Sequence, residues 1–252
     1  MNDESRVIGK RKDISYGSTL DFFNDRAERY TENNPYSVTM YQDSNPNLVE
    51  TRNKKEVEKL LPLLKIDSKS RVLDVACGIG RWSDAIEEKI EEYCGIDFSS
   101  RLIELAKKRN QFGSNRDFIV GHSADLRKIL KENGKGKYNR ILLIGSLMYL
   151  NDSDVESVMR QVEEICEERA LICIREPVGI INRLTLSDFY SEELNHNYNA
   201  IYRTRDELKK VFELTLMSRG FVLEESNFLF LEDKMNNREE TSQYYFIFVR
   251  KG

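Results

Sequence analysis

Two acidic residues and two glycines stand at the spacing of a site for a ribose-containing ligand. Asp74 precedes Gly78 and Gly80, and Asp97 follows 23 residues after Asp74. A carboxylate at about this distance from a glycine-rich turn binds ribose hydroxyls in Rossmann-type sites. The glycines let the backbone turn sharply and let a ligand approach the main chain. The chemistry indicated is therefore binding of a nucleotide-type ligand.

The elements around these residues are the ones that such a site requires. Residues 71–75 are mostly apolar and β-branched, which predicts a buried parallel strand. The segment 82–86 predicts the start of a helix, whose N-terminal N–H groups point at whatever lies over the turn. A strand, a glycine turn and a helix in this order place the ligand at the carboxyl edge of a sheet.

The type of nucleoside follows from the third position of the glycine pattern. Dinucleotide sites use G-x-G-x-x-G, but position 83 is Ser. The run Asp-x-Ala-x-Gly-x-Gly at 74–80 instead resembles the first motif of class I S-adenosylmethionine-dependent methyltransferases of the bacterial, small-molecule type. The resemblance implies that the turn contacts the methionine part of the cofactor. It also implies that Asp97 holds the ribose and that Phe98 lies against the adenine.

The resemblance extends over residues 68–176. Residues 117–121 resemble the family's third strand, and 122–126 stand where the family contacts the adenine edge. Residues 138–146 resemble the fourth strand, which ends beside the sulfonium. Two departures are His122, where an Asp is common, and Asn139-Arg140, where an Asp usually opens the strand. The cofactor-binding residues that the resemblance implies are Asp74, Ala76, Cys77, Gly78, Gly80, Asp97, Phe98, Ser123, Ala124, Asp125, Ile144, Gly145 and Ser146, with His122 in the cofactor wall.

Composition excludes several other classes of protein. The net charge is −4, from 39 basic and 43 acidic residues that are mixed along the chain, which disfavours binding to nucleic acid. Apolar runs such as 141–144 are too short to span a membrane. The polar first residues do not resemble a signal peptide, so a cytoplasmic location is expected. The four cysteines are expected to be reduced core thiols, with no metal site, because they form no C-x-x-C pair.

Alternation of strands and helices predicts an α/β fold with a Rossmann-like, doubly wound, seven-stranded and mostly parallel sheet. Residues 221–230 and 243–250 predict a terminal β-hairpin, which makes the last strand antiparallel. Residues 1–66 predict an N-terminal helical cap, with one helix capped by Ser18 or Thr19 and another over 48–64. Residues 67–252 would form the S-adenosylmethionine-binding domain.

Two helix boundaries and a long connection complete this organisation. Ser153 is expected to cap one helix, and the capping box Thr204–Glu207 to open another that Gly220 ends. The connection 177–203 is longer than a plain link requires, so it is predicted to be a loop that forms a substrate lid.

The methyl acceptor should lie at the ends of the fourth and fifth strands and under the lid. A hydroxyl acceptor benefits from a general base, so the predicted catalytic residues are Tyr149, Glu176 and His196. The predicted substrate-binding residues are Tyr36, Tyr41, Arg175, Tyr202 and Arg203. Six of these residues have an alternative interpretation: His196 as a solvated loop residue, Arg175 and Glu176 as an ion pair, Arg203 as a partner of Asp206, and the two cap tyrosines as packing residues.

The resemblance implies a methyltransferase that uses S-adenosyl-L-methionine on a small or carrier-linked metabolite. Residues 36–64 and 186–203 are similar to bacterial enzymes of surface-polysaccharide and secondary-metabolite pathways, which favours O-methylation of a sugar or nucleotide-linked sugar. N-methylation of a small amine is the nearest alternative. An RNA or protein methyltransferase and a non-catalytic cofactor-binding protein are further alternatives. The sequence leaves open the acceptor, the use of a base and the oligomeric state.

Overall fold

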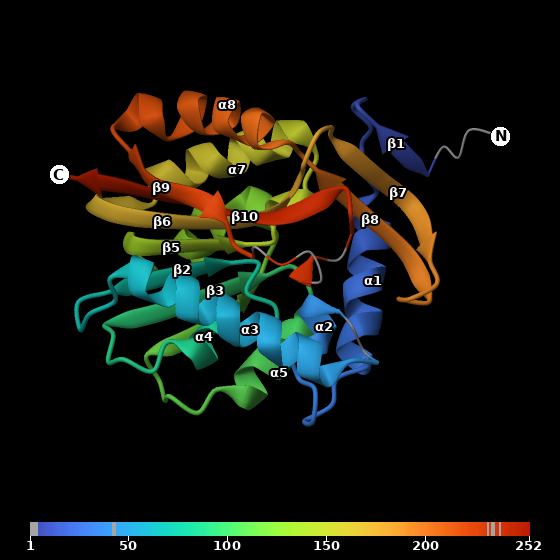
Figure 1. The fold of residues 1–252 in the computed structure, drawn as a ribbon. Coiled ribbons are helices and arrows are strands. Elements are labelled where there is room, and N and C mark those ends of the chain that lie inside the picture. The colour runs from blue at the N-terminus through green and yellow to red at the C-terminus, as the bar shows by residue number, and fades with distance from the viewer. Residues whose placement is uncertain (1–4, 42–43, 231, 233–234, 237) are drawn as a thin grey trace.

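A computed structural model describes residues 5–41, 44–230, 232, 235–236 and 238–252. A seven-stranded sheet with the strand order β4-β3-β2-β5-β6-β10-β9 forms its centre (Figure 1). The strands are β2 (Arg71–Val75), β3 (Glu92–Asp97), β4 (Arg116–Val120), β5 (Tyr138–Ile144), β6 (Cys166–Gly179), β9 (Val222–Phe228) and β10 (Thr241–Lys251). The first five run parallel, and β10 pairs antiparallel with both β6 and β9. The predicted fold class, with its antiparallel last strand, is therefore confirmed.

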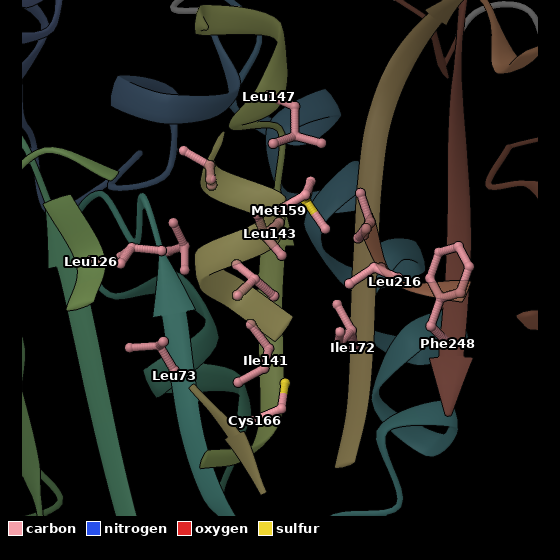
Figure 2. Close-up of a cluster of buried hydrophobic side chains, with 14 of the residues drawn as sticks. Leu73, Leu126, Ile141, Leu143, Leu147, Met159, Cys166, Ile172, Leu216 and Phe248 are labelled. Carbon is pink, nitrogen blue, oxygen red and sulfur yellow. The ribbon is translucent and has the colours of Figure 1, made fainter. Parts of the chain in front are cut away.

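Helices cover both faces of this sheet, because successive residues of each central strand point to opposite sides. Leu73, Ile141 and Ile172 pack in one core with α6, α7 and α8, and Figure 2 shows them in one cluster with Met159 of α7. Val72, Leu142 and Leu171 pack in the other core with α3, α4 and α5. The helices are α1 (Tyr16–Glu28), α2 (Ser37–Met40), α3 (Pro46–Leu60), α4 (Arg81–Ala85), α5 (Ser100–Arg109), α6 (Leu126–Glu132), α7 (Asp152–Glu164) and α8 (Arg205–Thr215), with 3₁₀ turns η1 (Leu61–Leu64), η2 (Ser123–Asp125), η3 (Leu147–Tyr149) and η4 (Met217–Arg219).

The helix ends differ from the predicted ones by a few residues. Ser15, not Ser18 or Thr19, caps α1, because its hydroxyl accepts the N–H of Ser18 at 3.3 Å. Asn151 precedes α7, two residues before the predicted Ser153. The capping box of Thr204 and Glu207 is confirmed at the start of α8. Gly220 does not end α8, which stops at Thr215; it closes η4 in a left-handed conformation with φ +89°.

The connection 177–203 is a β-hairpin, not the predicted loop. Strand β6 runs on to Gly179, and β7 (Leu184–Ser191) and β8 (His196–Tyr202) then pair antiparallel. A third strand, β1 (Arg6–Ile8), adds to β7, so the N-terminal region is not wholly helical either. Figure 1 shows this small sheet and α1 together at the end of the large sheet where β6 passes into β7.

Burial on both faces stabilises the hairpin. Leu184 and Leu186 on β7 and Tyr198 and Ala200 on β8 are buried in a cluster with Phe22 of α1. The residues between each pair, Thr185 and Asn199, are buried as well, at 0% and 2% exposed. Both are polar, so the sequence lacks the continuous apolar run that is typical of a strand covered on both faces. The hairpin therefore packs on the N-terminal helices and shields the carboxyl edge of the large sheet.

All four cysteines are buried and free. Within the described residues, no group of three or more His, Cys, Asp or Glu side chains could hold a metal ion. None of the helices in the same residues has both the length and the apolar composition of a membrane span.

Candidate active site

Two adjoining pockets open at the carboxyl edge of the parallel strands. One surrounds Asp97 and is called here the Asp97 pocket; the other is lined by Tyr41, Tyr149, Tyr198 and Tyr202 and is called the tyrosine pocket. The residues that line both are Thr39, Ala76, Gly78, Ile144, Gly145 and Tyr149. These shared residues place the junction of the pockets between the glycine turn after β2 and the end of β5.

In the Asp97 pocket a single carboxylate is fixed by the main chain. Asp97, at the end of β3, is 4% exposed and accepts the N–H groups of Gly78 and Ser99, each at 2.9 Å. Burial raises the pKa of Asp97 to about 6, although these two N–H groups act in the opposite direction. Phe98, Ser123 and the other lining residues leave the pocket partly apolar. The arrangement suits a flat heterocycle beside a polyhydroxylated ring.

The two glycines of the turn have different tasks. Gly78 has φ +56°, and a Cβ added there would lie 2.8 Å from Cγ2 of Thr39. Gly80 has φ +78° and lines neither pocket; its Cβ would meet the ring of Phe118 at 3.0 Å. Gly78 therefore lets the cap approach the turn, whereas Gly80 lets β4 pack closely against the start of α4; unlike Gly78, Gly80 does not line a pocket.

Three tyrosine hydroxyls meet in the tyrosine pocket. Tyr149 of η3 is hydrogen-bonded to Tyr198 at 3.0 Å and also to Tyr41. Burial raises the pKa of Tyr41 to about 12 and holds those of Tyr149 and Tyr198 well above their usual value. Tyr41 also has φ +65°, a conformation that is rare for a side chain of this size. Such strain in a pocket wall is common at functional sites.

A buried ionic network forms another wall of the tyrosine pocket. Glu56 of α3 is 2% exposed and pairs with Arg81 and, at 2.8 Å, with Arg175. Burial alone would raise the pKa of Glu56, but Arg175 and Arg81 outweigh it and hold that pKa below its usual value. Asp74, 2% exposed, accepts the hydroxyl of Tyr93 at 2.6 Å, and burial raises its pKa to about 7.

Sequence reasoning missed Arg52, Glu56 and Arg81 as pocket residues. The available signal was on the helix α3, where Arg52 and Glu56 share the buried face with the apolar Val49 and Leu60. Two charged residues on the apolar face of a helix must be paired with other charges when they are buried. Buried charged groups with perturbed pKa values are concentrated at functional sites.

The predicted site residues divide into two groups. Of the residues predicted to contact the methyl acceptor, Tyr41, Tyr149, Arg175 and Tyr202 line the tyrosine pocket, whereas Glu176, His196, Tyr36 and Arg203 line neither pocket. Those predicted for the cofactor that line one or both are Asp74, Ala76, Cys77, Gly78, Asp97, Phe98, Ser123, Ile144, Gly145 and Ser146. Ala124 and Asp125 lie behind this wall, where the C=O of Ala124 accepts an N–H of Gln161 at 2.6 Å.

Glu176 and Arg203 hold η3 instead of facing a substrate. The Glu176 carboxylate is 2% exposed and accepts the N–H groups of Ser146 and Leu147 at 2.8 Å and of Met148 at 3.1 Å. Arg203, 3% exposed, donates to the carbonyls of Leu147 at 2.8 Å and Leu150 at 2.7 Å. We correct their predicted roles from base and anionic anchor to positioning residues, because η3 carries Tyr149 between the pockets.

His196 and Tyr36 lie outside both pockets. His196 begins β8, where its ring packs on Phe22 at 5.5 Å and its Nδ1 lies 2.8 Å from the carbonyl oxygen of Asn197. Tyr36 donates to Asp84 at 3.1 Å and stacks on Arg109. These contacts correct the predicted base role of His196 and the predicted substrate contact of Tyr36: both residues fasten the N-terminal cap to its neighbours.

Comparison with known proteins identifies the family of this chain. Residues 48–215 match the methyltransferase domain family, which covers well over half of the chain. The chain belongs to that family. Its fold is that of class I S-adenosylmethionine-dependent methyltransferases, which confirms the class inferred from the motifs, and S-adenosyl-L-methionine is the cofactor of this class.

Individual relatives are distant. A demethylmenaquinone methyltransferase of Bacillus licheniformis is 27% identical over 89 residues, 34% of this chain and 38% of the relative. This match therefore spans less than half the length of the curated relative. A SAM-dependent methyltransferase of Leishmania major has a TM-score of 0.62 at 15% identity, covering 92% of this chain and 82% of that one. The magnesium protoporphyrin IX methyltransferase of Synechocystis, solved with bound SAM, has a TM-score of 0.60 at 14% identity. That match covers 96% of this chain and 100% of the other.

Proposed function

We propose that this protein transfers a methyl group from S-adenosylmethionine to an oxygen of a small or carrier-linked metabolite. The observation that carries the proposal is the pair of pockets joined at Gly78 and Gly145. One pocket suits a nucleoside and the other an acceptor, and a methyl group at their junction would face both. Methyl transfer from a sulfonium is an in-line displacement, so holding donor and acceptor in line supplies much of the catalysis.

The residues of the Asp97 pocket fit the cofactor. The Asp97 carboxylate would accept the ribose hydroxyls, with the adenine between Phe98 and Ser123. The methionine part would pass Gly78 into the tyrosine pocket, where Asp74 would bind its ammonium and Arg52 its carboxylate. The sulfonium would then lie beside Gly145.

The tyrosine pocket suits a polar acceptor of small or moderate size. Rings of Tyr198 and Tyr202 can pack on the C–H faces of a sugar, and Gln243 can hydrogen-bond to its hydroxyls. These residues favour the sugar or nucleotide-linked sugar inferred from the sequence. The amine alternative is less favoured, because an ammonium-bearing acceptor would have to enter beside Arg175 and Arg81.

Two measurements test the proposal. Isothermal calorimetry with S-adenosylhomocysteine should show binding at one site per chain. Incubation with methyl-labelled S-adenosylmethionine and a bacterial metabolite extract should move label into small molecules. Binding without any transfer would favour a non-catalytic protein, and label found only in RNA or protein would favour a macromolecular acceptor.

Gly78→Val is expected to reduce affinity for S-adenosylhomocysteine by more than tenfold. The new side chain would meet Thr39, since even a Cβ lies 2.8 Å from its Cγ2, and φ +56° disfavours a branched residue. Calorimetry measures the loss, and thermal melting separates it from unfolding.

Gly134→Val is the matched control for Gly78→Val. Gly134 has a similar φ of +66°, and nothing lies within 4 Å of its added Cβ. This variant carries the same backbone strain outside the site, so it should bind the cofactor normally. Equal losses of affinity in the two variants would contradict the assignment of Gly78 to the site.

A further inference from the structure

Arg175 lies where the two pockets meet. A Cβ on Gly145 would be 3.0 Å from a terminal nitrogen of the Arg175 guanidinium, and Gly145 lines both pockets. One side of the guanidinium pairs with Glu56 at 2.8 Å, and another nitrogen donates to Gln243 at 3.2 Å. Its Nε is buried and has no hydrogen-bond partner among the described residues. Each terminal nitrogen also carries a second N–H, so the guanidinium can donate a further hydrogen bond beside the expected position of the sulfonium.

The charges of the tyrosine pocket favour an anion. Among the described residues that line it, the arginines are Arg52, Arg81 and Arg175, and the carboxylates are Glu56 and Asp74. In the proposed function the cofactor adds a sulfonium and an ammonium against a single carboxylate. Removing positive charge from water costs free energy unless the charge is paired. Arg52 interacts with Glu193, whereas Arg81 and Arg175 share the carboxylate of Glu56. A negative acceptor would supply a second anionic partner for Arg175.

The described lining of the tyrosine pocket also offers no general base for a hydroxyl acceptor. It contains no histidine, and Glu56 is engaged by two arginines. Burial raises the pKa of Tyr41 to about 12, so its phenol holds its proton at neutral pH. Asp74 lies on the side of the glycine turn, bonded to Tyr93, where the methionine ammonium is expected. An acceptor that is already deprotonated needs none of these groups.

We propose that the acceptor is a carboxylic acid and that the product is its methyl ester. This inference rests on the proposed function and narrows its acceptor to acids, including acidic sugars. Arg175 would hold one carboxylate oxygen while the other faces the methyl group. A lone pair of that oxygen forms the new O–C bond as the C–S bond breaks and its electron pair stays on sulfur. Sulfonium and carboxylate become neutral thioether and ester, and no proton is transferred.

The first experiment uses the whole protein, methyl-labelled S-adenosylmethionine and a bacterial metabolite extract. The low-molecular-weight product is treated with alkali, which releases volatile methanol from methyl esters but leaves methyl ethers and N-methyl groups intact. Release of most of the label as methanol is expected. Blocking carboxylates in the extract by carbodiimide-driven amide formation should abolish labelling. Label that stays bound in alkali would overturn this inference while leaving methyl transfer itself established; no transfer to any small molecule would overturn both.

The second experiment asks whether Arg175 recognises the acid. Arg175→Gln should raise the extract concentration needed for half-maximal labelling by at least tenfold, while the dissociation constant of S-adenosylhomocysteine changes less than threefold. Arg175→Lys should recover part of the loss because it retains the charge. Equal loss of acceptor and cofactor affinity in Arg175→Gln would overturn the assignment.

Arg140→Gln is the matched control. Arg140 is half-buried on the neighbouring strand β5, but its guanidinium donates to the carbonyls of Leu64 and Lys65, each at 2.7 Å, away from both pockets. This variant should leave both constants unchanged. A tenfold loss of acceptor affinity in it as well would show that the Arg175 effect is a general consequence of losing a strand arginine, which would contradict the proposal.

Discussion

Asp97→Ala is expected to weaken S-adenosylhomocysteine binding by about 2 kcal/mol, roughly thirtyfold, in a protein that remains folded. The carboxylate is 4% exposed and already oriented by two N–H groups, so the ribose hydroxyls would meet an acceptor that needs no rearrangement. Its removal leaves those hydroxyls unpaired and the N–H of Gly78 without its acceptor. Calorimetry gives the affinity, and unchanged binding would remove the basis of the site assignment.

The same carboxylate should give the binding a pH dependence. Burial raises the pKa of Asp97 to about 6, so the free protein protonates this group as the pH falls through about 6. A protonated carboxyl is a poorer acceptor for ribose, and the cofactor affinity of the wild-type protein should therefore fall below that pH. Asp97→Asn cannot titrate, so the ratio of wild-type to variant affinity should shrink as the pH falls. Asp74 titrates in both proteins, but at a lower pH in Asp97→Asn, because the charge of Asp97 is one cause, after burial, of its raised pKa.

The fold and the cofactor side of the site could be predicted because their signals are local. The turn from Asp74 to Gly80 and the acid at Asp97 lie within single strand–turn segments, and the structure puts Asp74, Gly78 and Asp97 at the pockets. The hairpin β7–β8 was missed because polar residues interrupt its apolar positions, among them Asp188, which has φ +50° at an irregularity in the strand register.

The acceptor side could be predicted only in part, because position in the chain does not fix the direction of a side chain. Arg175 and Glu176 are consecutive on β6, so they point to opposite faces of the sheet. One reaches the tyrosine pocket and the other the backbone of η3. Likewise Tyr202 lines the pocket, whereas Arg203 points at η3. The choice between neighbours depends on strand register, which is set by pairing with distant segments.

The second large effect is expected from Glu176→Ala, which should lower the free energy of unfolding by about 3 kcal/mol or more. The variant leaves the buried N–H groups of Ser146, Leu147 and Met148 without their shared acceptor. Burial raises the pKa of Glu176 to about 7, although these N–H groups act in the opposite direction. The change in stability is measured by urea unfolding, with the slope of the transition checked for two-state behaviour.

Arg203→Ala tests whether Glu176 acts by positioning η3 or by taking part in catalysis. Arg203 binds the carbonyl groups of the same turn, whereas Glu176 binds its N–H groups. If both residues position η3, each single variant should have a lower free energy of unfolding. The loss in the double variant should be smaller than the sum of the two single losses, because either substitution already disorders the same turn. Tyr149 would lose its fixed place between the pockets, so turnover should fall in both variants. Cofactor affinity should fall as well, because Ser146 and Tyr149 also line the Asp97 pocket. Glu176→Gln retains an acceptor oxygen for the turn and should recover part of both losses. A Glu176→Gln protein with full stability but no turnover would instead show that the carboxylate takes part in the chemistry.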